Sequence, residues 1–450
     1  MTTVVLLIPG IFGFGAFGSD EEPILEYFAG VRNILEPQLG DWKVLVHEPP
    51  PTGSLDERVA SLYDAVWRLQ HGQRLPHAKE QVTAHRIHLV GHSTGGVDAR
   101  LLANKDFHWV GGPRDEERAA ILASIGTIVT ISAPFRGTPV VRHIDALRDP
   151  VLTVAHYLTL LGVFRNSHVD GLFLRLLRGA AGGVAGLLGL ASLVRTPSRI
   201  VAHLGRRAAA RPDTGDEEQG HTVAVQIQSF LRKLENDRQL YHDLSVEHMR
   251  DVNERLRETS EFPLICSYVT ISPRPPCIDI GRDMLGRLVY GILYGRTTQR
   301  QLDGAQPGSC DRLIGSPERI AKLMASRVSC DGAVPTRSQT LEDKAQGIVL
   351  ADHLDVVGSF EGGTGADVMR SGSGFDQKLF EELWCDIAAR LKSSPPFKPK
   401  RLLSWRLRSV PPRHPWYGAR KPVAHGGEHH ARSRPSRRTR SPLGRVQRRE

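Results

Sequence analysis

A short apolar run that ends in Gly-His-Ser-Thr-Gly-Gly constrains this chain more than any other feature. Residues 87–90 read Ile-His-Leu-Val, and residues 97–103 follow the turn with a helical pattern. The turn places Ser93 between Gly91 and Gly95. A sharp turn between a strand and a helix forces the serine backbone into a strained conformation, which only small neighbours tolerate. The pattern predicts a nucleophile elbow that exposes the serine hydroxyl above a buried strand, with a purely structural glycine-rich turn as the alternative.

Apolar strands alternate with helical stretches over the first third of the chain. We expect strands at residues 4–8, at 43–46 and at the end of 121–131, and helices over 24–35 and 55–69. In the last of these, apolar residues recur three and four positions apart, as on one face of a helix. Strands that are apolar on both faces and separated by helices are typical of a mostly parallel sheet covered on both sides. The sequence therefore predicts an α/β fold.

The second half of the chain continues this alternation less regularly. Strands are expected at 262–271 and 347–350, and a helix over about 377–391 closes the fold. Between the two strands runs a polar, glycine-rich stretch in which we assign neither helix nor strand. The Ser-Ser-Pro-Pro sequence at 393–396 marks the predicted boundary, so that residues 1–395 form one α/β domain.

An apolar insertion interrupts this domain at residues 145–245. The patterns at 151–163 and 172–177 are apolar and helical, and 179–194 is an uncharged run rich in glycine, alanine and leucine. That run is shorter than the roughly 18 to 20 residues that a membrane-spanning helix needs. Segments of low stability that present apolar surface to a substrate are typical of lids over active sites. We therefore predict a helical lid or cap here and no transmembrane span.

The positive charge of the chain is concentrated at its end. The formal net charge is +10, but residues 398–450 carry 16 Lys and Arg against two acids, which leaves the rest of the chain mildly acidic. The tail lacks hydrophobic periodicity and cannot bury a core, so residues 396–450 are predicted to be disordered. A cationic tail can bind phosphates, but this one has no nucleic-acid-binding motif, and a solvated tail without a partner is equally consistent. No specific nucleic-acid partner is predicted.

Cysteine usage and the first residues bear on the cellular compartment. The five cysteines are scattered without a C-x-x-C pair, which argues against a zinc ribbon or a redox motif. Residues 1–8 contain no cationic segment, and no small-residue cleavage site follows them. They are expected to form the first buried strand rather than a signal peptide. As written, the chain is predicted to be cytoplasmic, with secretion left open.

Two further residues complete a candidate catalytic set with Ser93. A serine hydroxyl is a weak nucleophile unless a histidine takes its proton and an acid orients that histidine. In enzymes with this elbow, the order along the chain is serine, acid, histidine. Asp331 and His353 fill the last two places, each after an apolar run that should end at the carboxyl edge of the sheet. Asp343 is the alternative acid, and His92, inside the elbow, is expected to pack rather than to react.

A glycine-rich loop follows the first predicted strand. Residues 9–15 read Pro-Gly-Ile-Phe-Gly-Phe-Gly, so backbone N–H groups can face a cavity without side-chain obstruction. Enzymes with this elbow form an oxyanion hole from such a loop and from the N–H of the residue after the nucleophile. We expect the donors to be the N–H groups of Ile11 and Thr94. A flexible apolar loop and a phosphate-binding turn are the alternatives, although the spacing lacks G-x-G-x-x-G followed by a helix.

Several motifs occur in one order along residues 1–390, separated by insertions. They are Pro-Gly-Ile-Phe-Gly-Phe at 9–14, Gly-His-Ser-Thr-Gly-Gly at 91–96, Ile-Ser-Ala-Pro-Phe-Arg-Gly-Thr-Pro at 131–139, Asp-Leu-Ser at 243–245 with Asn253 ahead of the 263–268 strand, Asp-Gly-Ala-Val-Pro at 331–335 and Asp-His-Leu-Asp at 352–355. In these motifs the chain resembles bacterial triacylglycerol lipases of the α/β-hydrolase superfamily. The resemblance implies the α/β-hydrolase fold, with Ser93 as nucleophile, His353 as general base and acid, and Asp331 as orienting acid.

The resemblance also implies a substrate class and a metal. It implies a carboxylic ester hydrolase that cleaves acylglycerols or other lipid esters through an acyl-enzyme, in transient contact with a lipid–water interface and without a cofactor. Many members bind a structural calcium through an Asp two residues after the catalytic His. Asp355 matches that position, while Ser359 stands where a longer amide is usual. Pro9 replaces the usual His before the oxyanion glycine, and the basic tail lies outside the family pattern.

Other functions are consistent with the same residues. The triad could serve an esterase of small soluble esters or an acyltransferase, because the sequence does not distinguish water from an alcohol as acceptor. From a different class, the chain could be a non-catalytic hydrolase-fold binding module whose tail binds anions. An intact triad favours the enzyme over the binding module.

Overall fold

The computed structural model describes most of the predicted α/β domain. The chain divides into two units, Met1–Lys398 and Pro399–Glu450, and all described residues belong to the first. They are residues 2–11, 13, 16–18, 23–76, 78, 80–143, 239–256, 265–275, 284–299, 307–340, 344–365, 367 and 369–393. The predicted tail and all but the last residues of the predicted lid lie outside these ranges. No helix in these ranges is long and apolar enough to cross a membrane.

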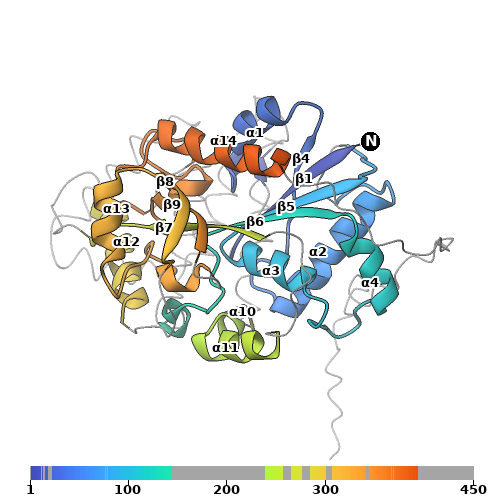
Figure 1. The fold of residues 1–450 in the computed structure, drawn as a ribbon, viewed down its shortest axis with the longest axis horizontal. Helices are drawn as coiled ribbons and strands as arrows, with labels where there is room; N and C mark the ends of the chain where they lie inside the picture. Colours follow the sequence, from blue (N-terminus) through green and yellow to red (C-terminus); the bar gives the residue numbers. More distant parts are fainter. Residues whose placement is uncertain are drawn as a thin grey trace, which may run out of the picture. The chain divides into compact units, whose positions relative to one another are not determined.

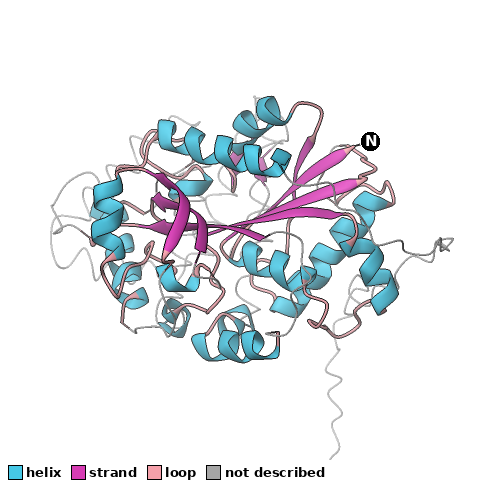
Figure 2. Cartoon of the chain, viewed as in Figure 1, coloured by secondary structure: helices cyan, strands magenta, loops and turns pink. Residues whose placement is uncertain are grey.

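Seven parallel strands form the central sheet (Figure 2). Their order is β4-β1-β5-β6-β7-β9-β8. The strands are β1 (Thr3–Ile8), β4 (Lys43–Val46), β5 (Arg86–His92), β6 (Ile125–Ile131), β7 (Ile265–Ile271), β8 (Ser309–Ile314) and β9 (Lys344–Leu350). The prediction of a mostly parallel sheet is confirmed. The chain passes from β1 outward to β4 and then returns to the other side of β1 with β5, so the order of the strands reverses at β1. In open α/β sheets, ligands bind at the carboxyl ends of the strands beside such a reversal.

Helices cover both faces of the sheet, as predicted (Figure 1). Two of them, α1 (Val31–Leu39) and α14 (Gln377–Ser393), pack in one apolar cluster with Val5 and Leu7 of β1. On the other face, α2 (Leu55–Gln70) and α3 (Thr94–Ala103) pack in a second cluster with Val4, Leu6 and Ile8. Successive side chains of a strand point to opposite faces, so a continuous apolar strand supplies both clusters. The remaining helices are α4 (Asp115–Leu122), α10 (Gln239–Asp243), α11 (Val246–Arg255), α12 (Met284–Thr297) and α13 (Pro317–Met324).

A capping box fixes the start of α2. The Ser54 hydroxyl oxygen accepts a hydrogen bond from the backbone N–H of Glu57 (3.2 Å), and the Glu57 carboxylate accepts one from the backbone N–H of Ser54 (3.0 Å). Two N–H groups that the helix start leaves unpaired are thus satisfied. The helix runs from Leu55 to Gln70, which confirms the predicted helix over 55–69 and places Arg58 in its first turn.

The predicted helix over 24–35 is wrong in its first half. Pro23–Glu26 forms β3, which pairs antiparallel with β2 (Ala16–Gly18), and α1 begins only at Val31. Gly30, directly before the helix, has a φ of 76°. Glycine adopts this left-handed conformation without steric cost, and it separates the hairpin from the helix.

The stretch without assigned elements between the last two predicted strands contains α12, β8 and α13. β8 is an edge strand with mostly exposed residues, so it lacks the apolar run by which buried strands are recognised. α13 begins with Pro317 after Ser316, whose hydroxyl oxygen accepts a hydrogen bond from the Arg319 N–H (3.3 Å). A serine cap followed by proline is a helix-start signal, although α13 was not predicted from it.

Candidate active site

Ser93 lies on a strained turn between β5 and α3. Its φ is 55° and its ψ is −127°, and its backbone N–H donates to the Ile131 carbonyl (2.8 Å). A Cβ atom added to Gly91 would lie 2.3 Å from the Gly95 carbonyl oxygen, and one added to Gly95 would lie 2.1 Å from the Ile8 carbonyl oxygen. A non-glycine residue at such φ costs on the order of 1–3 kcal/mol and persists only where the surrounding structure determines it. The close approach to these backbone atoms explains why both neighbours of the turn are glycines.

The structure brings Ser93, His353 and Asp331 into one hydrogen-bonded row. His353 Nε2 lies 2.9 Å from Ser93 Oγ, and His353 Nδ1 lies 2.8 Å from Asp331 Oδ2. The backbone N–H of His353 also donates to the carbonyl of Asp331 (2.9 Å). Because an ionised carboxylate can only accept, Nδ1 carries the proton and Nε2 presents its lone pair to the serine hydroxyl. The alternative acid, Asp343, lies outside the described residues.

The carboxylate of Asp331 is fully buried and accepts hydrogen bonds on both oxygens. Its Oδ1 accepts two backbone N–H groups from its own turn, at 2.9 and 2.7 Å. Its Oδ2 accepts the Thr270 hydroxyl (2.7 Å) and the Gln339 amide (3.2 Å) in addition to His353. A buried charge requires such partners, and together they fix the orientation of the acid. Thr270 and Gln339 were not predicted from the sequence, because neither lies in one of the recognised motifs.

His92 connects the loop after β1 to the backbone of His353. Its Nε2 lies 2.8 Å from the His353 carbonyl oxygen and its Nδ1 lies 2.8 Å from the Tyr27 hydroxyl, which also accepts the Gly10 N–H (3.0 Å). A carbonyl only accepts, so Nε2 is the protonated nitrogen and Tyr27 donates to Nδ1. Burial and the neighbouring His353 hold the pKa of His92 well below its usual range. His92 is therefore a neutral positioning residue, which extends its predicted packing role.

The loop after β1 lies against Ser93. A Cβ atom added to Gly10 would lie 2.6 Å from Ser93 Cβ and 3.0 Å from its Oγ. Ile11 follows in a turn and packs against the core cluster on the α2–α3 side. Thr94 is the first residue of α3, so its N–H is one of the four that a helix leaves without an intrahelical acceptor. The two predicted oxyanion donors thus belong to the two backbone segments that flank the serine.

A buried ion pair between Arg58 and Asp98 also supports the loop after β1. Arg58 and Asp98 approach to 2.7 Å, and neither side chain is exposed. The Arg58 guanidinium also donates to the carbonyls of Pro9 and Pro50, both at 2.9 Å. Burial raises the pKa of Asp98, and the charge and hydrogen bonds of Arg58 oppose that shift. Pro9 is therefore anchored through its backbone oxygen.

Two further buried carboxylates follow β9, on either side of His353 and Leu354. Asp352 accepts the N–H groups of Leu354 and Asp355 (3.0 and 3.1 Å), and Asp355 accepts the Asp352 N–H (2.8 Å) and the Ser373 hydroxyl (2.9 Å). Burial raises the pKa of Asp355 to about 7, and burial with the nearby Asp355 charge raises the pKa of Asp352 well above its usual range. Calcium takes six to eight oxygen ligands, whereas these two acids are engaged mainly by N–H and O–H donors. Nothing in the described residues shows a bound calcium, and calcium at Asp355 stays a prediction.

Comparisons with known proteins gave matches among solved structures only. No protein-family model and no curated protein matches the chain. The chain is similar to EstA from Clostridium botulinum (16% identity, 86% of each chain, TM-score 0.44). It is also similar to lipase 1 from Pelosinus fermentans (15% identity, 87% of this chain and 98% of that chain, TM-score 0.45) and to the Staphylococcus hyicus lipase (14% identity, 86% and 95%, TM-score 0.43). The all-parallel sheet, the helices on both its faces and the strained elbow at Ser93 give the chain the architecture of the α/β-hydrolase fold.

Proposed function

We propose that this chain is a serine ester hydrolase that acts through a covalent acyl-enzyme at Ser93. The observation that carries the proposal is the continuous row from Ser93 Oγ through both ring nitrogens of His353 to Asp331. A nucleophile in hydrogen-bond reach of a base, which an acid in turn orients, is the arrangement that activates a serine hydroxyl. The strained, glycine-flanked turn adds support, since it places that hydroxyl at the carboxyl end of β5, beside the loop after β1.

In the acylation half of the reaction, Ser93 Oγ attacks the ester carbonyl carbon as its proton passes to His353 Nε2. The carbonyl electron pair moves to the oxygen, which is stabilised by the N–H groups of Ile11 and Thr94. Asp331 stabilises the imidazolium without taking its proton. The intermediate then collapses, the ester C–O bond breaks, and the alcohol leaves with the proton from Nε2.

The deacylation half repeats these roles with water. Nε2 of His353 accepts a proton from water, whose oxygen attacks the acyl carbon. As the second tetrahedral intermediate collapses, the bond between the acyl carbon and Ser93 Oγ breaks, Nε2 returns the proton to Oγ, and the carboxylic acid leaves. Removal of one oxyanion donor typically lowers kcat by 10² to 10³. Every step uses side chains and backbone groups of this chain, so the proposed chemistry needs no cofactor and no metal.

The proposed substrates are acylglycerols or other lipid esters. The support is the apolar character of the predicted lid, much of which lies outside the described residues, together with the motif resemblance to triacylglycerol lipases. The direct test measures hydrolysis of esters with short and long acyl chains, below and above the concentration at which they form micelles, by wild type and Ser93→Ala. Turnover of long-chain esters that rises above micelle formation and disappears in Ser93→Ala is expected. A preference for acetate or butyrate esters would refute the lipid assignment, and equal turnover by Ser93→Ala would refute the proposed mechanism.

A further inference from the structure

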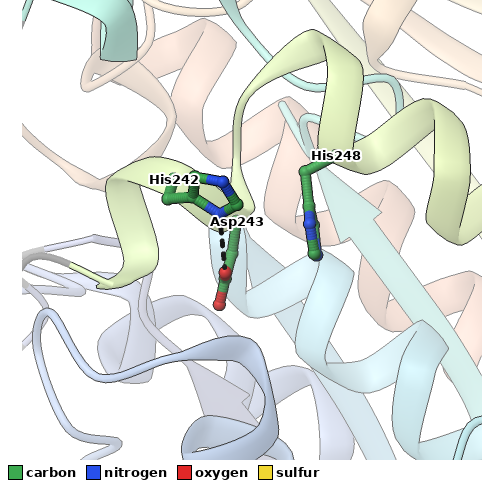
Figure 3. A group of neighbouring side chains, drawn as sticks. All are labelled: His242, Asp243 and His248. Carbon is green, nitrogen blue, oxygen red and sulfur yellow. Dashed lines mark ion pairs between the residues drawn. The ribbon is translucent and has the colours of Figure 1, made fainter.

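Three metal-ligating side chains meet at the corner between α10 and α11, outside the candidate active site (Figure 3). His242 and Asp243 end α10, and His248 lies in the first turn of α11. One potential ligand atom from each residue lies within 4.8 Å of those of the other two. No other group of three His, Cys, Asp or Glu in the described ranges comes together in this way. Figure 3 shows the three side chains projecting to the same side of the corner.

The separations are close to those of a tetrahedral zinc site. Zinc bonds of about 2.0–2.2 Å to nitrogen and oxygen place neighbouring ligand atoms roughly 3.3 Å apart. Nδ1 of His242 and Oδ1 of Asp243 already lie 3.6 Å apart. The rings of His242 and His248 have centroids 5.4 Å apart. The His242 side chain is 69% exposed, so its ring has room to rotate toward the other two ligands.

The carboxylate in this cluster is already oriented by neighbouring donors. Asp243 is buried, and its Oδ2 accepts the backbone N–H of Leu55 at the start of α2 (2.9 Å). Its Oδ1 accepts the Gln239 side-chain amide (2.9 Å). Each carboxylate oxygen has a second lone pair for a metal. Ligands held by such hydrogen bonds bind metals better than mobile ones, because their orientation is set before the ion arrives.

We propose that His242, Asp243 and His248 bind a divalent transition-metal ion, with zinc as the best match. Two imidazoles and one carboxylate suit zinc, whereas magnesium and calcium prefer ligand sets made of oxygen alone. Water completes the four-coordinate shell. The ion ties α10 to α11 and, through Asp243 and Leu55, to α2. This structural role is independent of the proposed ester chemistry.

The test is a titration of the full chain with Co²⁺, a spectroscopic substitute for zinc. We expect the strong visible d–d absorption of tetrahedral Co²⁺, and its loss on addition of one equivalent of Zn²⁺. His242→Gln and His248→Gln should each weaken Co²⁺ binding at least tenfold, since removal of even an outer-shell partner costs about 10- to 100-fold. His108→Gln, which replaces an exposed histidine elsewhere in the fold, should leave the spectrum unchanged.

A second measurement separates this site from histidines elsewhere in the chain. Zn²⁺ should raise the unfolding midpoint of wild type and of His108→Gln, because a ligand that binds only the native state stabilises it. It should raise the midpoint of His242→Gln much less. Equal shifts in all three proteins, or only the weak absorption of octahedral Co²⁺ in wild type, would overturn the proposal. The cluster would then be three neighbouring side chains that bind no metal.

Discussion

Replacement of Arg58 by methionine tests how far the loop after β1, which carries the proposed oxyanion donor Ile11, depends on one buried side chain. Arg58 is completely buried, lies 2.7 Å from Asp98 and donates to the Pro9 and Pro50 carbonyls. Removal of one partner of a buried ion pair costs about 3–5 kcal/mol, because the other charge stays buried without compensation. We expect Arg58→Met to lower the free energy of unfolding by about this amount.

A second substitution separates stability from catalysis. In the double variant Arg58→Met/Asp98→Leu no buried charge is left, so much of the lost stability should return. The Pro9 carbonyl still lacks its donor, so the loop after β1 loses this hydrogen bond. Misplacement of a group that contacts the substrate by about 1 Å can lower turnover roughly 10²-fold. We therefore expect stability to recover and kcat to stay low. Urea unfolding and hydrolysis of a p-nitrophenyl ester measure the two quantities.

Arg68→Met on the same helix is the matched control. Arg68 pairs with Asp64 at 2.6 Å, but its side chain is 28% exposed. Such a pair contributes at most about 1 kcal/mol, so both stability and kcat should stay near wild type. Recovery of wild-type kcat in the Arg58→Met/Asp98→Leu variant would refute the reasoning, because the anchor at Pro9 would then be dispensable.

Five further substitutions test the positioning of His353, the buried acid after β9 and the packing of two glycines. His92→Phe removes the hydrogen bonds that join the loop after β1 to the backbone of His353, whereas Tyr27→Phe removes only the bonds made by the Tyr27 hydroxyl. We expect kcat to fall in both variants and further in His92→Phe; wild-type kcat in both would exclude a positioning role. Asp355 has its pKa raised to about 7 by burial, so the native state holds a proton that the unfolded chain releases near pH 4. The free energy of unfolding should therefore fall as pH rises from about 4 to 7. In Asp355→Asn, the midpoint of urea unfolding should change less with pH over this range; the same pH dependence in wild type and variant would contradict this expectation. Gly95→Ala places a methyl group 2.1 Å from a backbone oxygen and should prevent native folding, so that no cooperative thermal transition is observed. Gly295→Ala in α12 meets no atom within 4 Å and should raise the free energy of unfolding by roughly 0.5–1 kcal/mol.

The elbow was predictable because its determinants are local. Ser93, its flanking glycines and the helix that follows lie within a short stretch, and each enforces the same turn. The sheet was predictable for a similar reason, since buried parallel strands are continuous apolar runs. Asp331 and His353 were candidates because the order of catalytic residues along the chain narrows the choice.

The residues that support the site were not predictable in this way. Arg58 contacts Asp98 from 40 positions away, and the Gln339 amide donates to the Thr270 carbonyl across 69 positions. No local pattern encodes such pairs, because they arise from the packing of α2 and of the loop after α13 against the sheet. β8 was missed for a different reason, since an exposed edge strand carries no apolar run.

Labelling with a fluorophosphonate, followed by peptide mapping, tests most directly whether Ser93 is an activated nucleophile. Ser132 is an internal control, because it is the other serine with a positive φ in the described ranges. Its hydroxyl is hydrogen-bonded to the Thr270 hydroxyl (2.7 Å) and not to a histidine. We expect label on Ser93 alone, and no label in His353→Ala. Detergent is included to expose a covered site. Folded wild-type protein that takes no label with or without detergent, or that labels equally after His353→Ala, would contradict the account.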